Sequence, residues 1–135
     1  MLDDGRAVFV KSGPASEVLL SEAAGLRWLG EVAQVPEVIE AEPDRLVLAW
    51  VREERPTAEA AERFGRTLAR MHRAGAPSFG APWPGFIAEL PMDNAAAPDW
   101  PAFYGERRVL PFLRQARLPA SDVALVERAV ERLPE

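Results

Sequence analysis

The sequence of 135 residues predicts an α+β fold, and two observations support this prediction. Short runs of β-branched and apolar residues, bounded by Gly, Pro and Asp, fill much of the first 51 residues. Within residues 57–74, apolar residues recur at three- and four-residue spacing, which is typical of an amphipathic helix. The content of 48% hydrophobic and 27% charged residues is ordinary for a globular chain, so we expect a packed core.

The first third of the chain predicts one strand, one helix and two further strands. A strand at 6–12 ends at a Gly-Pro pair, and a helix at 15–32 follows with an apolar stripe along one face. A short strand at 36–41 and a strongly apolar strand at 45–51 are separated by a Pro-Asp turn. The segment Asp3-Asp4-Gly5 is a hairpin-turn signal, so we expect a further strand upstream of it.

Helices are predicted after a polar linker at 52–56. Thr57 is an N-cap residue and Gly75 a C-terminal stop, which together bound a long helix. The segment 76–101 holds six of the thirteen prolines and four aromatic residues, which indicates an ordered functional loop.

Two more helices follow the proline-rich segment. Asp99 is predicted to cap a helix that runs to about Arg117, with a kink at Pro111. Ser121 or Asp122 is predicted to cap a last helix, which ends near Leu133.

Composition excludes several classes of function. The chain has no cysteine and one histidine, so neither a disulfide framework nor a structural zinc site is expected. A formal charge of −5 argues against a nucleic-acid partner. No charged-then-apolar leader and no apolar run of membrane-spanning length occur, so we expect a cytoplasmic protein without membrane contact.

Lys11 is the single lysine of the chain, and the other fifteen basic residues are arginines. It stands at the end of an apolar strand, where a compact ammonium suits a phosphate contact better than a planar fork. A kinase small lobe uses such a lysine, oriented by a glutamate of the following helix. Glu22 lies beside the apolar face of that helix, whereas Glu17 in the first turn is explained by the helix dipole. A solvated charge at a strand end is the alternative for Lys11.

Five segments resemble the fructosamine kinase (ketosamine-3-kinase) family, within the aminoglycoside-phosphotransferase and choline-kinase group. They are residues 8–12 (VFVKS), 21–29 (SEAAGLRWL), 68–72 (LARMH), 79–94 and 100–111 (WPAFYGERRVLP). The resemblance covers almost the whole chain but only about the first half of such an enzyme. It implies a partial protein-kinase-like fold, with a small lobe of antiparallel strands and one helix followed by the helical start of the large lobe.

The resemblance implies ATP-dependent phosphorylation of the 3-hydroxyl of a ketosamine, small or protein-bound, in deglycation repair. Lys11 would bind phosphate and Glu22 would hold it, and backbone groups of Ala49 and Val51 would bind the adenine edge. Family members commonly carry an acidic residue where this chain has Ala49, a departure expected to matter little for backbone contacts. ATP and Mg²⁺ are the implied cofactors.

Other residues allow two interpretations each. Trp83, Phe86, Asp93 and Asn94 would line the sugar side by the resemblance, or they belong to a structural wrap over the helices. His72 is interpreted as a structural or capping histidine rather than a general base, and Trp50 either flanks adenine or closes the core. A further set is assigned to helix packing with an internal ion pair: Phe103, Tyr104, Glu106 and Arg107.

Several parts of a complete kinase are not found in the sequence. The glycine-rich loop, the His-Gly-Asp catalytic segment and the carboxylate ligands for Mg²⁺ are missing, so no catalytic residue is assigned. We therefore expect a partial N-lobe at 1–52 and the start of a C-lobe at 53–135, without turnover on its own. Self-association through an exposed sheet edge is expected. The alternatives are another small-molecule kinase of the same group and a non-catalytic binding or oligomerisation module.

Overall fold

The computed structural model describes residues 5–134, which fall into two compact units. Unit 1 ends at Gly75 and unit 2 begins at Ala76, and each is described by itself. The predicted boundary between an N-lobe (1–52) and a C-lobe (53–135) is a separate division of the chain, and it stays a prediction. Asp3 and Asp4 of the predicted hairpin turn lie outside the described residues, and Gly5 has a φ of 83°, which glycine adopts readily.

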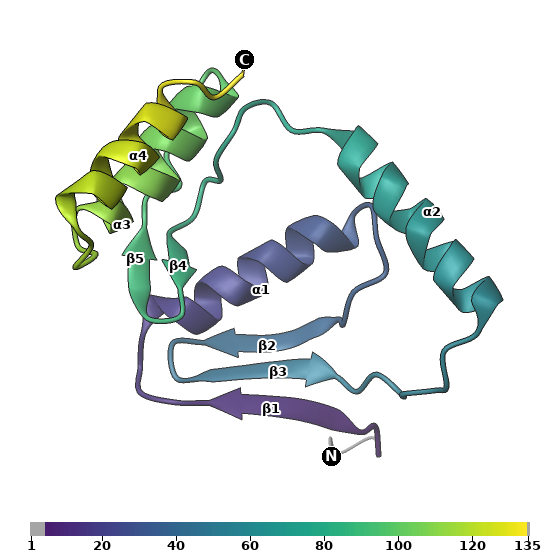
Figure 1. Cartoon of the computed structure of the whole chain (residues 1–135). Coiled ribbons are helices and arrows are strands. Elements are labelled where there is room, and N and C mark those ends of the chain that lie inside the picture. The colour runs from purple at the N-terminus through teal and green to yellow at the C-terminus, as the bar shows by residue number, and fades with distance from the viewer. Residues whose placement is uncertain (1–4, 135) are drawn as a thin grey trace. The chain divides into compact units, whose positions relative to one another are not determined.

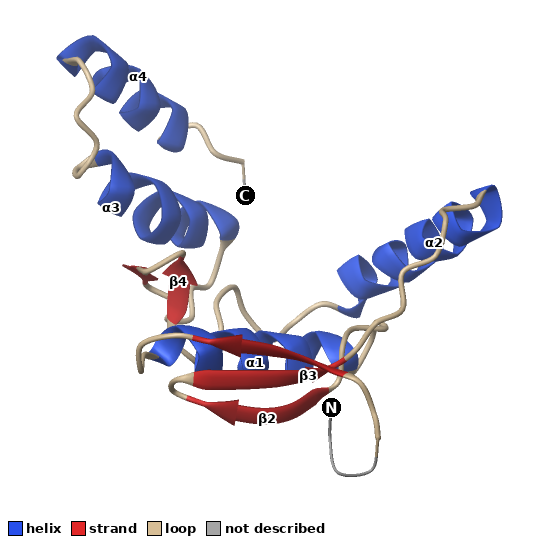
Figure 2. Cartoon of the chain, turned by 90° about the horizontal axis from the view of Figure 1, so that it is seen from below, coloured by secondary structure: helices blue, strands red, loops and turns tan. Residues whose placement is uncertain are grey.

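Unit 1 contains a three-stranded antiparallel sheet in the order β1-β3-β2. Its strands are β1 (Val8–Ser12), β2 (Val38–Glu42) and β3 (Arg45–Ala49), and helix α1 (Glu17–Gly30) packs against β2 and β3 (Figure 1). Figure 2 shows α1 on one face of this sheet. The predicted α+β class with antiparallel strands and one helix in the small lobe is thus confirmed.

The core of unit 1 lies where α1 meets the central strand. Leu19 and Ala23 of α1 contact Leu46 and Leu48 of β3, and Leu46 is fully buried. Burial of a leucine side chain stabilises a fold by about 1.5–3 kcal/mol. These contacts determine which face of α1 packs against the sheet.

Helix α2 (Ala58–Ala74) begins and ends at the predicted residues. The Thr57 hydroxyl accepts a hydrogen bond from the Ala60 N–H at 3.1 Å, and Gly75 follows the helix with a φ of 69°. None of its seventeen residues, all of which the structure describes, is buried, and Phe64 is 68% exposed.

Unit 2 begins with a small hairpin and continues into helices. Strands β4 (Gly85–Ile87) and β5 (Leu90–Met92) pair antiparallel around a two-residue turn, in which Ala88 has a φ of 53°. The helical elements are η1 (Ala102–Val109), α3 (Leu110–Leu113) and α4 (Ala120–Val130). The segment 76–101, predicted to be an ordered loop, therefore contains a hairpin.

The predicted helix after Asp99 is present, but its middle is π-helical. The Asp99 carboxylate accepts from the Ala102 N–H at 2.8 Å, as a cap does. Pro111 has no N–H to donate to the Arg107 carbonyl, and the Leu110 N–H instead reaches back five residues to the Gly105 carbonyl. The π-helical turns of η1 therefore lie directly before Pro111. Helix α3 then ends at Leu113, whereas the sequence predicts a helix to about Arg117.

The predicted cap of the last helix is wrong. Helix α4 begins at Ala120 after Pro119, and no side chain caps it. The Ser121 hydroxyl instead lies 3.2 Å from the Asp122 carboxylate, while the Asp122 N–H donates to the Pro119 carbonyl. Pro119 occupies the N-cap position with an extended backbone, and its carbonyl accepts from the Asp122 and Val123 N–H groups. No helix among the described residues is long and apolar enough to cross a membrane.

Candidate functional site

An ion pair joins β1 to α1. The Lys11 ammonium lies 2.6 Å from a carboxylate oxygen of Glu22, and the side chains are 47% and 35% exposed. The contact that the sequence predicts between these two residues is present. Because both side chains reach solvent, the pair stabilises the fold by less than about 1 kcal/mol. Its exposure leaves the ammonium accessible to a ligand.

The buried face of α1 determines where Glu22 lies. Leu19 and Ala23 are 7% and 0% exposed, and they anchor the helix on Leu46 of β3. Lys11 is the β1 partner of Leu46 in the antiparallel register. Leu46 therefore pairs with the residue that carries the ammonium and also packs against the helix that carries the carboxylate.

The end of β3 supplies backbone groups at the predicted hinge. The Ala49 N–H donates to the Glu37 carbonyl at 2.9 Å, and the Trp50 N–H donates to the Ala7 carbonyl at 3.3 Å. Val51 follows the strand and is 58% exposed. Trp50 is 59% exposed, so it does not close the core of unit 1.

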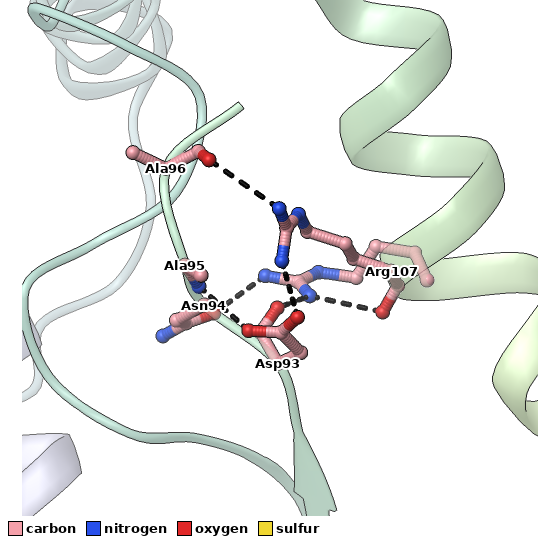
Figure 3. A network of polar contacts seen from close by, with 6 residues as sticks. Asp93, Asn94, Ala95, Ala96 and Arg107 are labelled. Atoms are coloured by element: carbon pink, nitrogen blue, oxygen red, sulfur yellow. Dashed lines mark hydrogen bonds and ion pairs between the residues drawn. The ribbon is translucent and has the colours of Figure 1, made fainter. Parts of the chain in front are cut away.

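A second polar network lies in unit 2, between the segment after β5 and η1 (Figure 3). Arg107 forms an ion pair with Asp93, and its guanidinium also donates to the Ala96 carbonyl at 3.4 Å. Arg108 donates to the Asn94 side-chain oxygen and to the Asp93 carbonyl. The Arg107 Nε is buried, and it has no hydrogen-bond partner among the described residues.

The electrostatics of this network favour the ionised form of Asp93. The Ala95 N–H, at 2.8 Å from the Asp93 carboxylate, is the main cause that lowers the pKa of Asp93, and Arg107 and Arg108 lower it further. Burial lowers the pKa of the Arg108 guanidinium, which remains charged because arginine titrates far above neutral pH.

Aromatic side chains surround the same helix. Phe103 lies 6.0 Å from Phe79, and the Arg108 guanidinium sits 4.2 Å above the Phe103 ring. Trp100 and Tyr104 stack with centroids 4.6 Å apart. Phe103 and Tyr104 thus pack along the helix as predicted.

The internal ion pair predicted with Glu106 and Arg107 is replaced by a longer-range contact. The partner of Arg107 is Asp93, fourteen residues away, and Glu106 is exposed. Sequence reasoning missed Arg108 altogether, because no local spacing links it to Asn94.

Other predicted positions stand apart from these two networks. His72 is exposed in the last turn of α2, where a basic side chain complements the helix dipole. Within residues 5–134 no three acidic, histidine or cysteine side chains gather closely enough to hold a metal ion.

The three-stranded antiparallel sheet, with a strand lysine held by a helix glutamate, defines a protein-kinase-like small lobe. The sequence pattern of the fructosamine kinase family matches residues 1–135. The chain belongs to the fructosamine kinase family.

Two curated proteins of similar sequence have names that fit this family. The chain is 38% identical over 101 residues to a probable ketoamine kinase of Thermus thermophilus, covering 74% of this chain and 37% of that protein. It is 39% identical over 67 residues to a chloroplastic protein-ribulosamine 3-kinase of Arabidopsis thaliana, covering 48% of this chain and 21% of the relative.

Solved structures also resemble the chain. A crystal structure assigned to a fructosamine-3-kinase of Thermobifida fusca is 45% identical with a TM-score of 0.90, over 98% of this chain and 52% of that one. One from Haemophilus somnus, with a TM-score of 0.76 and 19% identity over 95% of this chain and 48% of that one, shares the fold. The chain thus spans about half the length of these solved relatives and less of the curated ones.

Proposed function

We propose that this chain supplies the nucleotide-binding part of an ATP-dependent ketosamine 3-kinase. The observation that carries the proposal is the 2.6 Å contact between Lys11 and Glu22 on a kinase-like sheet. Family membership and the relatives named as ketoamine and ribulosamine kinases support the substrate class.

The side chain of Lys11 would bind the α- and β-phosphate oxygens of ATP as a point charge. Glu22 would keep the ammonium pointed at them by the ion pair. At the end of β3, the Ala49 carbonyl would accept from the adenine amino group and the Val51 N–H would donate to the ring. Ala49 already donates its own N–H to Glu37, which holds the backbone at this position in place.

The described residues fit ATP better than they fit Mg²⁺. Lys11 is a partly exposed cation beside backbone groups at a strand end, which suits a nucleotide. No cluster of metal-ligating side chains lies within residues 5–134, so no Mg²⁺ site is assigned to them. When bound, ATP supplies the γ-phosphoryl group that the reaction transfers.

The substrate side is proposed to lie in unit 2. Trp83 and Phe86 are half-buried and would contact the ketosamine. Asp93 and Asn94 belong to the same side, but their side chains are engaged by Arg107 and Arg108. In this proposal the first two residues contact the sugar and the other two shape the segment that carries them.

The 135-residue chain is proposed to bind nucleotide without turnover. Its sequence contains no His-Gly-Asp segment, and an aspartate that orients the attacking hydroxyl contributes much of the catalysis of phosphoryl transfer. A phosphoryl-transfer assay with ATP and fructosyl-lysine tests this point. Turnover by the purified chain would show that another residue performs this role.

The sheet edge at β1 is proposed to mediate weak self-association. β1 is an outer strand of the order β1-β3-β2, and its Phe9 and Val10 are 48% and 51% exposed. An exposed strand edge pairs readily with a second chain. Light scattering across a dilution series, on the wild type and on Val10→Lys, measures this association.

The nucleotide proposal is tested by titrating a fluorescent ATP analogue into the chain. Lys11→Met should weaken binding by at least about tenfold, because a charge-assisted contact is lost. Arg66→Met, on an exposed position of α2, is the matched control for loss of one positive charge. Equal affinity of the wild type and Lys11→Met would refute the proposal.

A further inference from the structure

Asn94 is the residue through which the segment 79–97 is held together. Its side-chain amide donates to the Trp83 carbonyl at 3.0 Å, and its backbone carbonyl accepts from the Ala81 N–H at 2.9 Å. A Cβ atom added to Gly85 would lie 2.6 Å from the Asn94 side-chain oxygen. Gly80 adopts a φ of 110°, and a Cβ atom added to it would lie 2.6 Å from the Asn94 carbonyl oxygen. The glycines therefore let the segment close around this one side chain.

Arg108 connects Asn94 to the helix. Its guanidinium spans two groups of the segment, the Asn94 side-chain oxygen and the Asp93 carbonyl, while its plane covers the Phe103 ring. The planar guanidinium of arginine can donate several hydrogen bonds and stack on an aromatic ring at the same time, which the lysine ammonium cannot do. Arg107 adds a second connection through the Asp93 carboxylate.

The π-helical turn explains how two consecutive residues reach one segment. Consecutive side chains diverge by about 100° around an α-helix and by less in the wider π-helix. The Arg107 carbonyl, to which Pro111 has no N–H to donate, accepts from the Arg108 guanidinium at 3.1 Å. This bond to the carbonyl of the preceding residue helps to orient Arg108.

The polar atoms of the two acceptor side chains are used inside this network. The Asp93 carboxylate accepts from Ala95 and Arg107, and the Asn94 amide bonds Trp83 and Arg108. Each side chain is thus held by two partners within the chain, which fixes its orientation. Both residues are therefore better suited to shape the segment than to contact substrate.

We infer that Asn94 and Arg108 are positioning residues, which hold Trp83 and Phe86 in a preformed arrangement for the ketosamine. This inference rests on the proposed function for its substrate, whereas the contacts between Asn94, Arg108 and the segment stand on their own. Asn94 acts on the Trp83 backbone directly, and Arg108 acts through Asn94.

Two substitutions in the 135-residue chain separate the contribution of Arg108 from that of Asn94. Arg108→Lys keeps the positive charge but loses the fork, so we expect it to behave like Arg108→Met. Asn94→Asp keeps an acceptor for Arg108 but removes the donor to Trp83. Arg117→Met, which removes an exposed arginine of the same unit, is the matched control.

The first readout is amide hydrogen exchange measured residue by residue. Both substitutions should raise exchange at Ala81 and at neighbouring amides of the segment by about tenfold, the effect of losing one partly buried hydrogen bond. Exchange at Leu46 of unit 1 should be unchanged, which separates loosening of the segment from failure to fold. Unchanged exchange at Ala81 in both variants would overturn the inference.

The second readout is the shift of the Trp83 indole NMR signal on addition of fructosyl-lysine. The wild type and Arg117→Met should respond equally, whereas Arg108→Lys and Asn94→Asp should need about tenfold more ligand. Faster exchange with an unchanged response would overturn the positioning role. A wild type that shows no response would overturn the proposed substrate, and the positioning role with it, while the exchange data would still report on the segment.

Discussion

The Lys11 ammonium and the Glu22 carboxylate lie 2.6 Å apart, on a strand and a helix that share the buried Leu46 beneath them. The ion pair holds the ammonium in one orientation. In the proposed function this orientation lowers the entropic cost of binding a nucleotide at Lys11.

Glu22→Gln should weaken nucleotide binding less than Lys11→Met does. The amide keeps a hydrogen-bond acceptor for the ammonium but loses its charge, so Lys11 is held less firmly and still attracts phosphate. Thermal unfolding should change by less than about 1 kcal/mol, because both side chains are partly exposed. Calorimetric titration with ATP measures the first effect, and a larger loss for Glu22→Gln than for Lys11→Met would contradict the assigned roles.

Leu46→Ala should destabilise unit 1 by about 2–5 kcal/mol, because it leaves a cavity under both α1 and β1. Val10→Ala on β1, where the side chain is 51% exposed, is the control and should cost less than about 1 kcal/mol. Urea unfolding followed by circular dichroism gives both values. Similar costs for the two substitutions would show that the core does not lie between α1 and β3.

Ala88→Gly should stabilise unit 2 by about 0.5–1 kcal/mol. Ala88 has a φ of 53° in the turn between β4 and β5, and a left-handed conformation costs alanine about 1–2 kcal/mol, part of which the greater chain entropy of glycine offsets. Glu89→Gly at the next position, where φ is not positive, should destabilise instead. Thermal unfolding of both variants checks the opposite signs.

The Asp93 network should make unit 2 less stable in acid. The pKa of Asp93 is lower in the folded chain than in the unfolded chain, chiefly because of the Ala95 N–H. Its contribution is therefore present above the unfolded value of about 3.9 and is lost as the pH falls through the folded value. The stability difference between the wild type and Asp93→Asn should be constant from pH 7 to about pH 5 and shrink below pH 4. A difference that grows in acid would contradict this sign.

Periodicity and capping residues predicted most of the helices and the first sheet. Thr57 and Gly75 bound α2 as expected, since both act through local backbone geometry. The predicted strand to Val51 is shorter in the structure, where β3 ends at Ala49. The length of a strand depends on how far its neighbouring strands extend, which the sequence of the strand itself does not specify.

Unit 2 was less predictable because its order comes from long-range contacts. The hairpin β4–β5 has three-residue strands, one with a proline, and its turn lacks Gly or Asn. Such strands give no periodic signal. Likewise Arg108 and Asn94 are fourteen residues apart, and only the folded segment brings them together. The Lys11–Glu22 contact was predictable because an exceptional residue ended a strand and the helix face selected one of two glutamates.

The central claim is that Lys11 binds the phosphates of ATP, and the single lysine of the chain permits a direct measurement. Protein labelled with ¹³C at the lysine Cε gives one side-chain signal, which needs no assignment. ATP should shift this signal, adenosine should shift it far less, and Glu22→Gln should reduce the response. Binding of ATP, seen by fluorescence or calorimetry, without a change at the Lys11 signal would contradict the account.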